Sequence, residues 1–151
     1  MKKVVVTGIG IKSCIGHSYK DVLHSLQNGK SGIVKNQTYA DMNFRSQISG
    51  SIDIDLKEVI DRKLLRFMGE APAYAYLAAL DAIDMSGLSD EMLSNPRVGI
   101  VAGSGGASTK AQVVTADITR DKGPKRIGPY AVTKTMGSTV AAILGTALKL
   151  Q

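Results

Sequence analysis

The residues that could carry covalent chemistry are one cysteine and two histidines near the amino terminus. Cys14 lies between Ser13 and Ile15, and His17 and His24 follow it closely. A thiolate beside a histidine base can act as a nucleophile, but nothing in this spacing places a base against Cys14. A lone cysteine usually packs as a small apolar residue, and the two histidines lack a partner at zinc-binding spacing. We therefore predict neither a nucleophile nor a metal or cofactor site here.

Two glycine-containing stretches resemble nucleotide-binding loops without completing the pattern. The Gly-Ile-Gly sequence at 8–10 follows an apolar run, but Ser13 occupies the position of the third glycine of a dinucleotide-binding turn. The Gly-Lys-Ser sequence at 29–31 has the end of a phosphate-binding loop, but His24 stands where its first glycine is required. We interpret 8–10 as a tight turn, and a nucleotide-binding α/β domain stays open as an alternative function.

A short basic segment is a candidate binding surface. Arg62 and Arg66 are four residues apart, so they share one face of a helix, with Lys63 beside them. Such charge is commonly just a solvated helix face. The functional interpretation is a docking patch for an acidic partner, and a non-catalytic interaction module of this kind is a second alternative function.

Small residues gather in two later segments. The Gly-Ser-Gly-Gly run at 103–106 ends an apolar stretch, and the segment 133–137 contains Met136 before a glycine. Either segment can be ordinary turn chemistry. Together they also suit a pocket whose walls need small residues and one flexible apolar side chain.

The elements that must position these residues predict an α/β fold. The segments 3–10 and 97–103 are apolar without alternation, which is typical of strands buried on both faces. Helical sequence separates them, so a mixed or parallel sheet with crossover helices is expected. Two strands do not complete such a sheet, and the chain therefore looks like the opening part of a longer protein.

Local signals define the helices. Ser18 caps a helix that runs to residue 28, and Asp61 caps a short basic helix. A long alanine-rich helix then has Pro72 in its first turn and Gly87 as its stop. Further helices are expected over 110–120 and after Ser138, and short strands near 47–54.

Composition narrows the function classes. The chain has 151 residues, 44% of them hydrophobic, which is enough for one domain with a real core. A net charge of +6 permits an acidic partner, but aromatic residues are only 5% and tryptophan is absent, so a nucleic-acid partner is not expected. No apolar run is long enough to span a membrane. The single cysteine fits a reducing compartment, and we predict a cytoplasmic protein.

Taken in order, these segments resemble the β-ketoacyl-acyl carrier protein synthases, the condensing enzymes of the thiolase fold. The resemblance covers the whole chain but only the first part of the family's length, and the glycine-rich run looks most like the type I elongating enzymes. The matching segments are 6–10, 15–16, 29–33, 60–63, 66–68, 95–99, 102–106, 128–130, 133–134 and Met136.

The resemblance implies roles for several residues. Lys63 and Arg66, with Arg62 beside them, match basic residues that meet the acidic acyl carrier protein. Gly106 lies where the family lines its acyl pocket, and a small residue there leaves room for a longer chain. Met136 matches a residue that the partner subunit contributes to the pocket, which implies a homodimer.

The resemblance also implies what this chain does not carry. The family's nucleophilic cysteine and two catalytic histidines come later than Gln151, so Cys14 inherits no catalytic role. We expect residues 1–151 to be the amino-terminal part of a ketoacyl synthase domain and to be inactive alone. The intact protein is expected to elongate acyl thioesters by decarboxylative condensation with malonyl-acyl carrier protein in fatty acid biosynthesis, without a cofactor. A polyketide synthase or chain-length-factor subunit is the alternative within the family.

Overall fold

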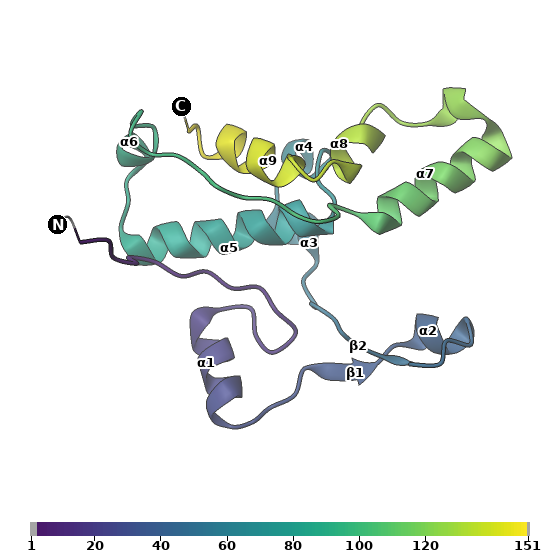
Figure 1. The fold of residues 1–151 in the computed structure, drawn as a ribbon, viewed down its shortest axis with the longest axis horizontal. Helices are drawn as coiled ribbons and strands as arrows, with labels where there is room; N and C mark the ends of the chain where they lie inside the picture. The colour runs from purple at the N-terminus through teal and green to yellow at the C-terminus, as the bar shows by residue number, and fades with distance from the viewer. Residues whose placement is uncertain (1–2, 151) are drawn as a thin grey trace.

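A computed structural model describes residues 3–150, and within them helices dominate (Figure 1). The 3-10 helix is η1, and the remaining elements are α-helices and two short strands. In chain order they are α1 (Tyr19–Gln27), β1 (Ile33–Lys35), α2 (Gln37–Asp41), β2 (Ile48–Gly50), α3 (Leu56–Val59), α4 (Arg62–Leu65), α5 (Glu70–Ser86), α6 (Asp90–Leu93), α7 (Thr109–Lys122), η1 (Pro124–Arg126), α8 (Ala131–Thr135) and α9 (Thr139–Ala147).

The helices begin and end where local signals predict. The Ser18 side chain accepts a hydrogen bond from the Asp21 backbone N–H at 3.2 Å, which caps α1. Asp61 Oδ1 accepts from the Lys63 N–H at 2.6 Å and caps α4. Pro72 is the third residue of α5 and lies in its first turn. Gly87 ends that helix with a φ of 68°, the left-handed conformation that favours glycine.

The principal core forms where α5 and α9 pack together. Ala73 of α5 is completely buried, and Ile143 of α9 joins the same apolar cluster. Met68 and Ile60, from the segment that leads into α5, complete the cluster with Leu77. The small side chain of Ala73 lets a neighbouring helix approach closely, as the alanine-rich sequence predicts. This core fixes α3, α4 and α8 around the amino-terminal end of α5 (Figure 1).

The sheet differs from the expected one. The described residues contain one two-stranded antiparallel sheet, in which Ile33 pairs with Gly50 and Lys35 with Ile48. Of the short strands expected near 47–54, the described residues contain one, β2, and its partner β1 lies outside that range. The segments 3–10 and 97–103 are extended but are not strands, so the expected pairing of these two segments in a parallel or mixed sheet is not confirmed.

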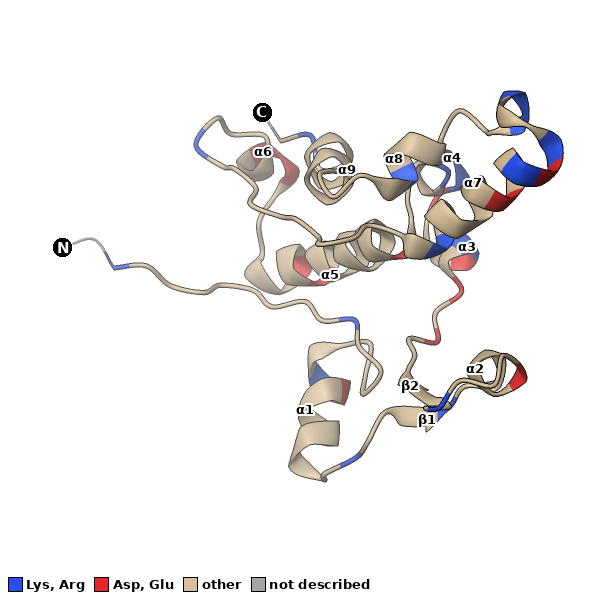
Figure 2. Ribbon diagram, turned by 45° about the vertical axis from the view of Figure 1, so that its right-hand side comes forward, with Lys and Arg blue, Asp and Glu red and all other residues tan. Residues whose placement is uncertain are grey.

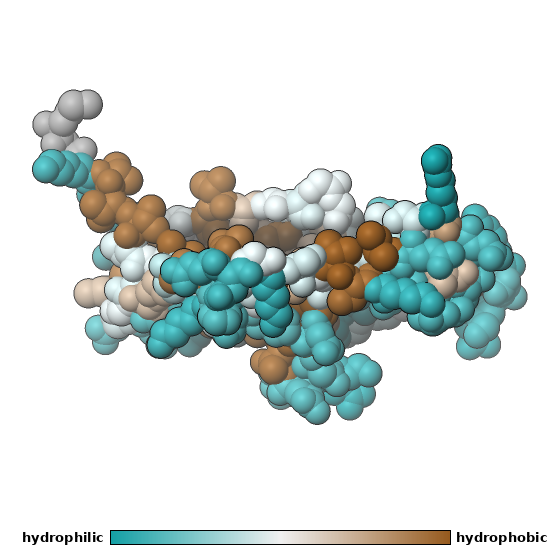
Figure 3. Space-filling view, turned by 90° about the horizontal axis from the view of Figure 1, so that it is seen from below, coloured by the Kyte–Doolittle hydropathy of each residue, from teal (hydrophilic) through white to brown (hydrophobic). Residues whose placement is uncertain are grey.

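The two extended segments lack the burial that their apolar sequence predicts. Val4 is 97% exposed and the side chain of Val101 is fully exposed, although both were expected on buried strands. Figure 3 shows the apolar side chains at the start of the chain as a brown run on the surface. Hydrogen bonds to neighbouring strands define a strand, and residues 3–150 place no such neighbour beside either segment.

The amino-terminal segment packs against α5 instead of a strand. A Cβ added to Gly8 would overlap the carbonyl oxygen of Ala82, and one added to Gly10 would overlap that of Ala78. The Lys12 Nζ donates to Asp81 Oδ2 at 2.6 Å and to the His17 carbonyl oxygen, which ties the following loop to the same helix. The glycines at 8 and 10 therefore allow a close approach to the backbone of α5, which a side chain at either position would prevent.

Candidate docking site and pocket wall

The basic residues expected to dock a partner lie on and just after α4. Arg62 and Lys63 open this helix and Arg66 directly follows its last residue; all three are exposed. The short helix is held by its Asp61 cap and by Leu64 and Leu65, which pack against the core cluster. The apolar side of the segment is therefore fixed, and its cations face solvent.

A hollow of about 620 Å³ lies beside α4 and gathers cations from three helices. Lys57 comes from α3, Arg62 from α4 and Lys134 from α8. Figure 2 shows the blue residues of α4 and α8 near one another, at the same end of α5. Arg66 completes the cationic lining, and the floor is apolar, formed by Leu65 and Met68. We call this set of residues the basic hollow.

The cations of the basic hollow are not neutralised by carboxylates within residues 3–150. The ion pairs of the described chain join Lys12 to Asp81, Lys110 to Glu70 and Arg120 to Asp117. None of them involves a residue of the basic hollow or Lys63. Four positive charges around one concavity, free of internal partners, make a site for an anionic group.

Arg66 is oriented by two aromatic rings. Its guanidinium carbon lies 4.8 Å from the ring centroid of Phe67 and 5.3 Å from that of Tyr130, which precedes α8. The two rings also contact each other edge to face, with centroids 4.9 Å apart and planes at 78°. The α4 and α8 segments, distant in sequence, therefore meet at this cation.

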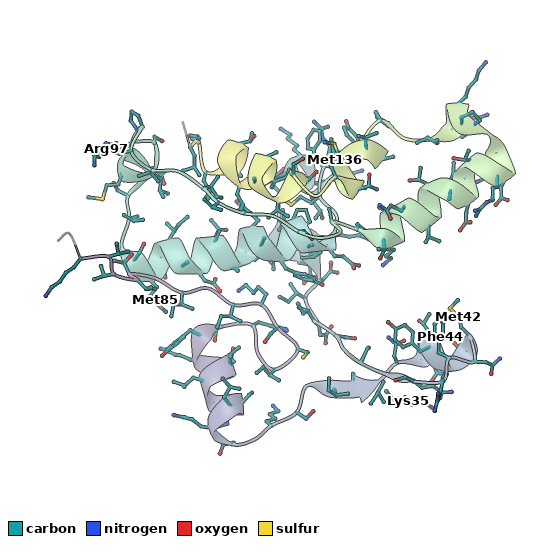
Figure 4. The ribbon with its side chains drawn as sticks, in the orientation of Figure 1. Lys35, Met42, Phe44, Met85, Arg97 and Met136 are labelled. Carbon is teal, nitrogen blue, oxygen red and sulfur yellow. The ribbon has the colours of Figure 1, made fainter. Side chains whose placement is uncertain are left out.

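Of the two residues expected in the acyl pocket, Met136 lines a hollow of the described chain whose lining does not include Gly106. Met136 directly follows α8 (Figure 4). It lines this hollow of about 340 Å³ together with Phe67 and Ile143. Gly106 is exposed, and a Cβ added there would meet no atom within 4 Å. The loop of Gly106 does reach the start of α9, because a Cβ on Gly137 would lie 2.8 Å from the Ser104 carbonyl oxygen.

Cys14 is partly exposed and packs against two glycines of the hairpin. A Cβ added to Gly32 or Gly50 would lie within 3 Å of its Sγ. Cys14, His17 and His24 line the same hollow of about 330 Å³, but the described residues show no hydrogen bond between the thiol and either ring. Among residues 3–150 no group of three or more potential ligands is arranged to hold a metal ion. Within the same residues, every helix is too short or too polar to cross a bilayer.

Comparison with known proteins decides the family. The family model for the β-ketoacyl synthase amino-terminal domain matches residues 1–151. The chain belongs to the β-ketoacyl synthase family. It is 48% identical over 152 aligned residues to 3-oxoacyl-[acyl-carrier-protein] synthase 1 of Haemophilus influenzae, an alignment that covers all of this chain and 37% of the relative. The chain thus spans a little over a third of the length of the curated relatives it matches.

Solved structures show that this ketoacyl synthase chain has the fold of the ketosynthases, a thiolase-like fold. The ishigamide ketosynthase/chain length factor superposes with a TM-score of 0.85 at 23% identity, over 97% of this chain and 37% of that one. A type II polyketide synthase acyl carrier protein in complex with its ketosynthase gives 0.76 at 21% identity, over 96% of this chain and 38% of that one.

The placement of three residues at or beside the basic hollow is not evident from sequence. Lys57 and Lys134 join the basic hollow from α3 and α8, and Tyr130 reaches Arg66. Lys134 lies inside the 133–137 segment, whose sequence suggests only a pocket wall. The type of each residue is visible in the sequence, but the approach of α8 to α4 depends on tertiary packing, which no local pattern encodes.

Proposed function

We propose that this chain is the amino-terminal part of a condensing enzyme that elongates acyl chains in fatty acid biosynthesis. The complete domain would join an acyl thioester to malonyl-acyl carrier protein by decarboxylative condensation. The 48% sequence identity to 3-oxoacyl-[acyl-carrier-protein] synthase 1 of Haemophilus influenzae, over the whole length of this chain, supports this proposal. We assign no catalytic residue to residues 1–151, and their roles are carrier docking and pocket wall.

The basic hollow and Lys63 are the proposed docking site for the acyl carrier protein. The observation that carries this assignment is the convergence of four cations from three helices without an internal carboxylate partner in the described chain. An acidic helix of the carrier would place carboxylates against Arg62, Lys63 and Arg66, and such charge-assisted contacts are strong and steer association. An acyl carrier protein bound to its ketosynthase among the structural neighbours is consistent with this partner class.

Charge reversal tests the docking proposal. In the full-length protein, Lys63→Glu with Arg66→Glu is expected to weaken binding of apo acyl carrier protein by more than about tenfold, measured by fluorescence anisotropy at low salt. Arg97→Glu is the matched control, because Arg97 is exposed at the far end of α5 near α6 (Figure 4). Equal affinity of the double variant and the native protein at low salt would refute the docking site.

Gly106 and Met136 are the proposed acyl-pocket residues. An open Gly106 leaves space for a long acyl chain, and the half-exposed Met136 offers an apolar side chain to a neighbouring subunit. We propose a homodimer in which the partner's copy of this methionine closes the pocket. Cross-linking of a Met136→Cys variant through its cysteine would test this arrangement, and a protein that stays monomeric at micromolar concentration would contradict it.

A polyketide ketosynthase or chain-length-factor subunit is the second candidate. The superposition on the ishigamide ketosynthase/chain length factor favours it only at the level of fold. Incubation of the full-length protein with acyl and malonyl carrier thioesters, followed by mass spectrometry, separates the two. A fatty acid synthase yields one condensation per cycle with saturated acyl primers, whereas a chain-length factor yields none unless a catalytic ketosynthase partner is added.

A further inference from the structure

The contact between Arg66 and two aromatic rings extends the docking proposal, on which the following inference rests. Arg66 has no carboxylate partner within residues 3–150, so an ion pair does not set its direction. Its guanidinium instead lies near the Phe67 and Tyr130 rings, at 4.8 Å and 5.3 Å from their centroids. Both distances are within the range of an attractive cation–π contact.

The ring contacts reduce the freedom of a long side chain. An exposed arginine loses considerable rotamer entropy when it binds a carboxylate, and that loss weakens the complex. A guanidinium already oriented before the partner arrives loses less. The edge-to-face packing of Phe67 on Tyr130 fixes the second ring relative to the first.

Of the two rings that contact Arg66, the Tyr130 ring is the better one to test by substitution. It precedes α8, 64 positions after Arg66 in the numbering, and it reaches this cation only through tertiary packing. Its hydroxyl makes no hydrogen bond to another group in the described chain, so the ring is the part that contacts Arg66. Phe67 is less suitable for a test, because it also lines the hollow of Met136.

We propose that Tyr130, together with Phe67, is a positioning residue for carrier docking, which holds the Arg66 guanidinium at the basic hollow for an incoming carboxylate. Tyr130 itself does not touch the partner in this arrangement. The proposal makes a specific prediction about coupling, because removal of the ring affects binding only while the guanidinium is present.

A double-mutant cycle tests the proposal in the full-length protein with apo acyl carrier protein as the probe. Tyr130→Leu is expected to weaken binding about three- to fivefold, the range of a partly exposed cation–π contact. Tyr130→Phe keeps the ring and is expected to bind like the native protein. In an Arg66→Ala background, Tyr130→Leu is expected to have no further effect. Tyr39→Leu is the matched control, since Tyr39 packs on Phe44 at 5.2 Å without a neighbouring cation in the described residues.

The possible outcomes separate this inference from the docking proposal. If Arg66→Ala leaves binding unchanged, docking at the basic hollow fails, and the positioning role fails with it. If Arg66→Ala weakens binding but Tyr130→Leu does not, docking stands and the positioning role is wrong. Equal losses from Tyr130→Leu in both backgrounds would show a general structural effect and would also overturn the proposal. Thermal unfolding of each variant identifies a folding defect, and Tyr130→Phe then still tests the ring against its hydroxyl.

Discussion

The basic hollow and the Gly103–Gly106 loop differ in how far this chain completes them. In the basic hollow, three helices converge, the floor is apolar, and aromatic rings orient Arg66. At the glycine loop, added Cβ atoms on Gly103, Gly105 and Gly106 would meet nothing within 4 Å. The geometry of the first region is therefore formed entirely within residues 3–150. The second has one wall, and we infer that another segment or subunit supplies the others.

Filling the open wall at the glycine loop is expected to have the largest effect on activity. A Cβ added to Gly106 meets no described atom within 4 Å, so Gly106→Phe projects its ring toward the side that we infer another segment or subunit covers. If Gly106 faces the acyl chain, elongation of long primers falls by more than about tenfold while short primers are still used. Rates of condensation with a series of acyl primers provide the measurement.

Gly105→Phe is the control for this change, since Gly105 is equally open and adjacent. An identical chain-length profile for the two variants would show that Gly106 has no special place in the pocket. A large loss of stability in Gly106→Phe would instead show that the loop is already packed in the full-length protein.

Gly69 lies between Lys134 of the basic hollow and Ser108, a residue shortly after the glycine loop. A Cβ there would lie 2.6 Å from Ser108 Cβ and 3.1 Å from the Lys134 carbonyl oxygen. We expect Gly69→Ala to lower the free energy of unfolding by about 1–3 kcal/mol, because backbone atoms on one side cannot move aside easily. Chemical denaturation measures this loss, with Gly99→Ala as a control that meets no atom within 4 Å.

A higher salt concentration is expected to affect the two regions differently, with a smaller effect than the substitutions above. The Debye length falls from about 10 Å at 0.1 M to about 3 Å at 1 M, so carrier docking at the exposed cations weakens as salt rises. The Gly103–Gly106 loop contains no charged side chain, so this screening does not act on it. In the full-length enzyme, salt should raise KM for carrier-bound malonate several-fold and leave kcat little changed. A KM independent of salt would contradict an electrostatic docking site.

The contrast between these regions also explains what sequence could and could not foresee. Ser18, Asp61 and Gly87 act within one helical turn, so their types and positions predict the helix ends that the structure shows. The basic residues of α4 can also be identified from sequence, because they lie close together within one short helix. Whether they form a docking site depends on α8, which tertiary packing brings to Arg66.

The extended segments show the opposite case. The valines at 4–6 and Val101 have the composition of buried strands, yet they are exposed because no neighbouring strand covers them within residues 3–150. Strand formation requires a partner from elsewhere in the chain, so an apolar run alone could not establish the sheet. The family match supplies the fold class, and the pairing of these two segments stays unconfirmed.

Tyr74 provides the smallest expected effect and a test of whether α5 stability is separate from docking. Partial burial raises its pKa above the usual value, the nearby Glu70 carboxylate adds to the increase, and Lys110 opposes it. The unfolded chain loses the phenol proton near pH 10, below the pKa in the folded state. The contribution of the protonated Tyr74 phenol to the free energy of unfolding is therefore fully present below about pH 10. It is lost as the pH rises through the pKa that Tyr74 has in the folded state.

Tyr74→Phe is expected to reduce the loss of stability as the pH rises above about pH 10, measured by urea unfolding, and to leave carrier affinity at neutral pH unchanged. Tyr19→Phe is a suitable control, because Tyr19 is 41% exposed on α1. The same pH dependence in both variants would show that Tyr74 is not the group responsible. A change in carrier affinity in Tyr74→Phe would show that packing at the start of α5, where Glu70 pairs with Lys110 of α7 at 3.2 Å, is coupled to the basic hollow. Docking would then not be independent of α5 stability, and the effects of the docking variants would have to be corrected for changes in folding.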